Sequence, residues 1–162
     1  MTLLVVQLTQ AEVDMCVVLA AQRNMVARGN GVVDRQIGKQ SALKTDYIGM
    51  VGEFAFCKYF NVFPDLAASP RSGSCDCVYK GVRIDIKSTD LASGRLLATT
   101  KENLDVDRYV LAIVNGNTVT FPGWIDRQDL IRESNLVDLG HGKGYAMTQD
   151  QLNKFKGERD GD

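Results

Sequence analysis

Two carboxylates in one short stretch of the chain are placed where they would repel each other. The sequence SCDCVYKGVRIDIKST, residues 74 to 89, reads as two short strands joined by a tight lysine-glycine turn. In the register that separates polar from apolar side chains, Asp76 lies across from Asp85, and Lys87 projects from the same face. Like charges directly opposite on neighbouring strands are destabilising. The pair therefore needs a compensating cation, a shared proton or flanking bases.

The register follows from how the side chains divide between the two faces of this hairpin. One face would carry only apolar side chains, which are Cys75, Cys77, Tyr79, Val82, Ile84 and Ile86. A shift by one residue would set Asp76 opposite Ile84 and mix polar with apolar side chains on both faces. An ordinary charged surface, in which Arg83 and Lys87 neutralise the two acids, remains the alternative interpretation of the charged face.

Glu53 is a third acidic candidate, on a largely apolar helix expected from about residue 46 to 60. Its neighbours three and four positions away are Gly49, Met50, Phe56 and Cys57. None of them is basic, so the usual ion pair along one helix is excluded, and a buried carboxylate without a counter-charge is costly. Gly49 and Gly52 also weaken the helix, which would make sense if another group approached it closely. The alternative is that Glu53 simply lies on a solvent-facing stripe.

The rest of the chain predicts an α/β fold, with a central mixed β-sheet flanked by helices. A first helix is expected from residue 9 to about 28, with a Thr9/Glu12 capping box. Its apolar stripe is Val13, Cys16, Val17 and Ala20. Strands are expected at residues 95–99, 108–114, 118–125 and 143–147, and further helices begin near Asp126 and at the Thr148/Gln151 capping box. We expect one domain over residues 1–156 and a disordered tail at 157–162.

Composition excludes several classes of protein. A chain of 162 residues with 44% hydrophobic and 24% charged residues fits one globular domain. Its formal net charge of −1 gives no global basic signature, so any nucleic-acid contact must come from a local patch. The N-terminal stretch resembles no signal peptide and no apolar run is long enough to span a membrane, so we expect a cytoplasmic protein. The four cysteines and the single histidine lack zinc-site spacing, and we interpret the cysteines as small apolar residues.

Basic residues gather between the first two helices. Residues 23 to 44 carry five basic side chains and one acid, which fits either a solvated linker or an arm that contacts phosphates. The candidates for contact with a nucleic-acid backbone are Arg28, Lys39, Lys44, Arg71 and Ser88. The sequence GHGKG at residues 140–144 lacks the spacing of a phosphate-binding loop, and we interpret it as a flexible loop.

The acidic residues and the lysine together resemble a known family. An acid on the first core helix, an Asp on one strand and (D/E)xK on the next are similar to the PD-(D/E)xK nuclease superfamily, with its restriction-endonuclease-like core. The matching residues are Glu53 in GMVGEFAF, Asp76 in SCDCV, and Asp85, Ile86 and Lys87 in RIDIKST, within residues 44 to 125. Cys75 stands where the family has its proline. The literal Pro-Asp pair ends at Asp65 in a loop, and we choose Asp76 because the hairpin places it beside Asp85.

The resemblance implies a metal-dependent nuclease that hydrolyses DNA phosphodiester bonds, as an endonuclease rather than an exonuclease. Asp76, Asp85 and the Ile86 carbonyl would bind Mg²⁺, with Mn²⁺ able to substitute, and Glu53 would hold a second ion or a water of the first. Lys87 would orient and help activate the attacking water. By analogy with the family, the chain would be a small phage-type nuclease and would form a homodimer. The alternative is a nucleic-acid-binding or structural protein that retains the fold without catalysis.

Overall fold

A computed structural model of the chain describes residues 3–29, 42–66, 75–101 and 103–156, so the predicted tail lies outside the described residues. The strands are β1 (Leu4–Gln7), β2 (Cys77–Tyr79), β3 (Val82–Thr89), β4 (Leu96–Thr99), β5 (Arg108–Asn115), β6 (Thr118–Asp126), β7 (Leu136–Asp138) and β8 (Lys143–Met147). The helices are α1 (Gln10–Gly29), α2 (Ala42–Phe60) and α3 (Arg127–Leu130), with 3-10 turns at Glu133–Asn135 and Gln149–Gln151. Within these ranges, no helix is both long and apolar enough to cross a membrane.

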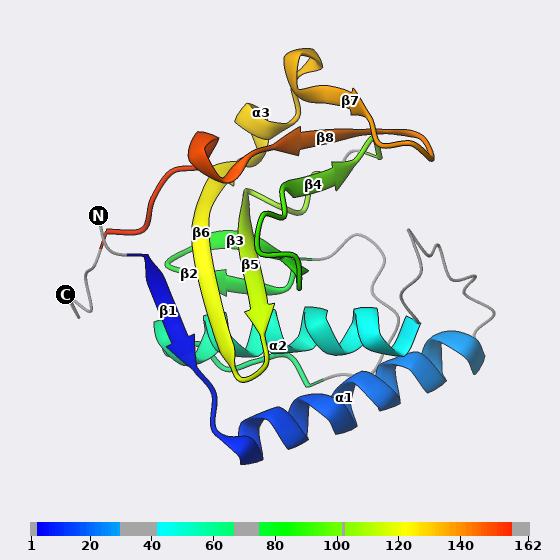
Figure 1. The fold of residues 1–162 in the computed structure, drawn as a ribbon, viewed down its shortest axis with the longest axis vertical. Helices are drawn as coiled ribbons and strands as arrows, with labels where there is room; N and C mark the ends of the chain where they lie inside the picture. The colour runs from blue at the N-terminus through cyan, green and yellow to red at the C-terminus, as the bar shows by residue number, and fades with distance from the viewer. Residues whose placement is uncertain (1–2, 30–41, 67–74, 102, 157–162) are drawn as a thin grey trace.

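Two sheets stack on each other, and the long helices cover only one of them. The larger sheet has the order β1-β6-β5-β3-β2, in which β3 and β5 run parallel and the other pairs antiparallel. Figure 1 shows α1 and α2 on one side of this sheet, and the smaller sheet β4-β8-β7 with α3 on the other. The α/β class and the mixed sheet are confirmed. Helices do flank the sheet, but a second sheet, which was not expected, covers the far face together with the short α3.

Strand β5 separates the two halves of the core, and its sequence shows why it is buried on both faces. Val110, Ala112 and Val114 pack into the cluster beneath α2. Tyr109, Leu111 and Ile113 pack into the cluster beneath the small sheet. Because side chains alternate between the two faces of a strand, a continuous apolar run is what a strand between two covering layers requires.

The expected strands are present, and so are the helices expected from residue 9, from about residue 46 and near Asp126, with the following differences. Strands β1 and β7 were not expected, and α2 begins earlier than predicted, at Ala42. Val17 lies on the exposed side of α1 rather than in its apolar stripe. The capping box of Thr148 and Gln151 is present, but it opens one 3-10 turn instead of a helix.

The predicted hairpin register is confirmed between β2 and β3. Cys77 pairs with Ile84, and Tyr79 pairs with Val82. Lys80 and Gly81 both have positive φ, of 48° and 78°, which gives the two-residue turn whose twist matches antiparallel strands. Cys77 and Ile84 lie in the core cluster beneath α2, as the apolar face requires.

Helix α2 lies directly against β3 and β5 at Gly52. A Cβ atom built on Gly52 would lie 2.0 Å from Ser88 Oγ and 3.2 Å from Ala112 Cβ. A Cβ atom on Gly49 would meet nothing within 4 Å among the described residues. The close approach predicted from these glycines is therefore present at Gly52, where the sheet lies against the helix. It is absent at Gly49, which faces open space among the described residues.

We predict opposite effects on stability when the two glycines are replaced. In Gly52→Ala the Ser88 hydroxyl can rotate away, but the Ser88 and Ala112 Cβ atoms cannot, and the free energy of unfolding should fall by about 1–2 kcal/mol. In Gly49→Ala the new methyl group enters open space on a helix, so the free energy of unfolding should rise by about 0.5–1 kcal/mol. Urea denaturation of both variants measures this difference, and equal effects would contradict the packing of α2 on Ser88.

Candidate active site

Asp76 lies where the pairing of β2 with β3 ends. Its amide donates to the Ile84 carbonyl at 2.8 Å, and Ile84 is the residue that pairs with Cys77. Asp76 and Cys77 thus both lie opposite Ile84, as in a β-bulge. The backbone bends at Asp76, and the register of the hairpin does not continue to a pair of Asp76 with Asp85. The prediction of a regular cross-strand pair is wrong in this detail. The bend also turns Cys75 toward the core cluster beneath the small sheet, away from Cys77.

The side chain of Asp76 nevertheless reaches Asp85. Its Oδ2 accepts a hydrogen bond from the Ile86 amide at 2.7 Å, and its carboxyl hydrogen-bonds the carboxyl of Asp85. Burial, then repulsion from Glu53 and Asp85, raise the pKa of Asp76 to about 9. The raised pKa favours the protonated form of Asp76, and such a proton is what two adjacent carboxyl groups need.

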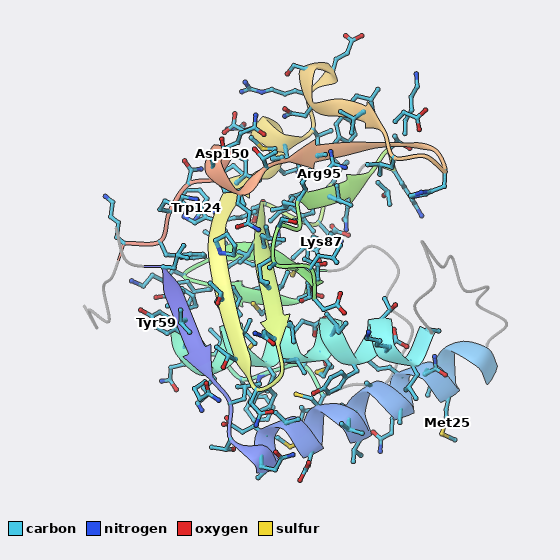
Figure 2. All side chains as sticks on the ribbon, in the orientation of Figure 1. Met25, Tyr59, Lys87, Arg95, Trp124 and Asp150 are labelled. Atoms are coloured by element: carbon cyan, nitrogen blue, oxygen red, sulfur yellow. The ribbon has the colours of Figure 1, made fainter. Side chains whose placement is uncertain are left out.

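Lys87 provides the positive charge of the site. Its Nζ lies 2.7 Å from Asp85 Oδ2 and 5.8 Å from the centre of the Tyr109 ring on β5. Burial lowers the pKa of Lys87, but attraction and a hydrogen bond to Asp85 outweigh it, so the pKa lies above its ordinary value. Figure 2 shows Lys87 between α2 and β4 in that view. The structure thus brings Asp76, Asp85 and Lys87 together, as the sequence predicts.

Glu53 has a counter-charge on α1, outside its own helix, which was not predicted. Arg23 Nη1, from α1, lies 3.3 Å from Glu53 Oε2, and the two side chains are only 19% and 15% exposed. Arg23 Nη2 also donates to the Asp65 carbonyl at 3.0 Å. One signal was available in the sequence, because Arg23 follows Ala20 at the three-residue spacing of the buried stripe of α1. Asp65 itself, the alternative acid, lies in an exposed segment.

Tyr109 is the other residue of the site that was not predicted. It is paired with Asp85 in the parallel register of β3 and β5, so its side chain rises from the same face of the sheet. Its ring is buried and faces the Lys87 ammonium. The sequence placed Tyr109 in a buried strand but gave no sign of which partner that strand would have.

The donor groups of Asp76, Asp85 and Ile86 fit a small divalent cation. Across the described part of the chain, no three Asp, Glu, Cys or His side chains are gathered as a metal cage. The Ile86 amide points to Asp76, and in a strand the carbonyl of the same residue points to the same edge. Two carboxylates and one carbonyl are thus available, and Mg²⁺ needs only one or two carboxylates because it retains several waters.

The predicted contacts with a nucleic-acid backbone receive unequal support. Lys44 is half-exposed in the first turn of α2, where its Nζ lies 3.3 Å from Asp90 Oδ2. The Ser88 hydroxyl is buried under α2 with no hydrogen-bond partner among the described residues, so its position does not support a contact with phosphate. Lys39, Arg71 and the side chain of Arg28 lie outside the described residues.

The glycine-rich sequence at residues 140–144 covers the end of the turn between β7 and β8 and the first two residues of β8. Gly140 and Gly142 have positive φ, and the Leu139 amide donates to the Gly142 carbonyl at 2.8 Å. A phosphate-binding loop precedes a helix, whereas this turn leads into a strand. The interpretation as a loop holds.

Comparisons of the chain with protein-family models, with curated proteins and with solved structures found no match. The interpretation of the site therefore rests on the residues and contacts described above. Its main features are the hydrogen-bonded carboxyl groups of Asp76 and Asp85 and the ammonium group of Lys87 on Asp85.

We predict that the metal-free protein loses stability as the pH rises from about 4 to about 9. The folded state holds a proton on Asp76 that the unfolded chain releases near pH 3.8. The stabilisation is therefore complete below that pH and is lost as the pH rises toward the folded pKa, by at most about 1.4 kcal/mol per pH unit. Urea denaturation in EDTA at several pH values measures the slope.

The matched variant is Asp76→Asn, which cannot ionise but keeps an oxygen to accept from the Ile86 amide. It should flatten the dependence between pH 5 and pH 8. The same slope in wild type and variant would show that Asp76 is ionised in the folded state.

Proposed function

We propose that this chain is a divalent-metal-dependent nuclease that hydrolyses DNA phosphodiester bonds, built on a restriction-endonuclease-like core. The observation that carries the proposal is the hydrogen-bonded pair of carboxyl groups at the edge of β3, with Lys87 on one of them and Glu53 close enough to raise the pKa of Asp76. The order of these residues along the chain, Glu53, Asp76, Asp85 and Lys87, resembles that of the PD-(D/E)xK nucleases.

A purely structural role explains this arrangement poorly. Burying carboxyl groups against each other costs free energy even when a proton is shared. A core that needed only stability would be served better by apolar side chains, as on the opposite face of the same hairpin. Groups with strongly shifted pKa values gather at functional sites for this reason.

Each residue has a defined part in the proposed reaction. Asp76, Asp85 and the Ile86 carbonyl would hold the cation, with Asp76 in its ionised form. Mg²⁺, or Mn²⁺ in its place, offsets the negative charge of the phosphate and makes water more acidic. Lys87 stays protonated because its pKa is raised, so it orients the attacking water and the phosphate as a hydrogen-bond donor and a positive charge, not as a base.

The attack would form a bond from the water oxygen to phosphorus and break the bond from phosphorus to the leaving sugar oxygen. The proton lost by the attacking water would pass to solvent, and a solvent water would protonate the leaving oxygen. Buried Tyr109 holds the ammonium of Lys87 from the side of β5. Lys44, half-exposed at the start of α2, is the described candidate for contact with the DNA backbone. Endonuclease action and a homodimer complete the proposal by analogy with the family.

We predict metal-dependent cleavage of DNA that the site variants lose. Supercoiled plasmid, linear duplex, single-stranded DNA and a four-way junction are incubated with Mg²⁺ or Mn²⁺ and with EDTA. Asp85→Asn removes a metal ligand and Lys87→Met removes the positive charge, and each should lower the cleavage rate by about 10³-fold. Cutting of the closed circle and the junction would identify an endonuclease.

The control is Asp150→Asn, an exposed acid that Figure 2 places away from Lys87. It should cleave like the wild type. A folded Asp85→Asn variant that still cleaves would remove this site from the reaction. A pure wild-type protein that binds DNA but cuts none of the substrates would favour the non-catalytic alternative.

A further inference from the structure

Arg23 lies where its positive charge bears on the proposed metal site. Its guanidinium bridges two elements, with one nitrogen on Glu53 of α2 and the other on the carbonyl of Asp65, in the segment that follows α2. Neither Arg23 nor Glu53 is freely exposed, so the pair is shielded from solvent more than a surface ion pair is.

Glu53 needs a positively charged neighbour because other acids lie close to it. Glu53 and Asp85 both act on Asp76, so three acids share one small region. Lys87 balances Asp85, and Arg23 balances Glu53. Among the described residues no three acids are gathered as a metal cage, and Glu53 is held by Arg23.

We propose that Arg23 is a positioning residue that acts as a resident counter-cation at Glu53 and competes with the metal for this carboxylate. It stabilises the metal-free site, and it sets the metal affinity lower than the three acids alone would give. The proposal rests on the function proposed above. The same guanidinium donates to the Asp65 carbonyl. If Glu53 left Arg23 to bind the metal, the hydrogen bond that holds the segment after α2 would therefore change as well.

The test compares metal affinity with metal-free stability in the full chain. Arg23→Gln removes the charge but keeps a hydrogen-bond donor, and Arg23→Lys keeps the charge. Mn²⁺ is titrated into each protein and the free ion is followed by EPR, while Tm is measured in EDTA. We expect Arg23→Gln to lower Tm in EDTA and to bind Mn²⁺ about tenfold more tightly, whereas Arg23→Lys stays within about twofold of wild type.

Opposite changes in stability and affinity separate this role from a structural one, since a variant that merely loosened the site would lose both. In a Glu53→Gln background, replacing Arg23 should alter the Mn²⁺ affinity by less than about twofold. Unchanged or weaker Mn²⁺ binding in folded Arg23→Gln overturns the proposal.

Failure of the proposed function gives a different result from failure of this inference. If wild type binds Mn²⁺, Asp85→Asn does not, and Arg23→Gln changes nothing, only the role of Arg23 is refuted. If the folded wild type binds no Mn²⁺, both the metal site and the role of Arg23 are refuted.

Discussion

The hydrogen bond between the carboxyl groups of Asp76 and Asp85 is the constraint on which the site depends. It exists because β2 stops pairing at Cys77 and the backbone bends at Asp76, which turns the carboxyl toward the Ile86 amide and toward Asp85. The bond holds two like groups together only while one of them keeps a proton or a cation replaces that proton. In the proposed function, a divalent ion would take the place of that proton.

The fold provides rigid support on both sides of this bond. Gly52 lets α2 lie against β3, and Glu53 is the next residue of this helix, on one face of the sheet. Strand β5 runs parallel to β3 and presents Tyr109 behind Lys87 on the other face. The site therefore forms where one helix and three strands meet, and the two long helices and the small sheet bury those strands from opposite sides.

The hairpin, its register and the group of Asp76, Asp85 and Lys87 could be predicted, because alternation along a strand is a local property of the sequence. The bend at Asp76 could not, since it depends on where β2 stops and on a side chain bonding to the backbone of β3. The pairing of Glu53 with Arg23 joins residues thirty positions apart, and only the packing of α1 on α2 brings them together. Two strands of the small sheet, β4 and β8, were predicted. That they form a separate layer with β7 could not be predicted, because long-range packing decides it.

On the proposed function, a divalent cation replaces the proton that Asp76 and Asp85 share in the metal-free protein. The most direct measurement is calorimetric titration of Mn²⁺ at pH 7 in two buffers with different enthalpies of ionisation. We expect Mn²⁺ binding to release about one proton, and no such release in Asp76→Asn. Binding without proton release, or a folded wild-type protein that binds no Mn²⁺, would contradict it.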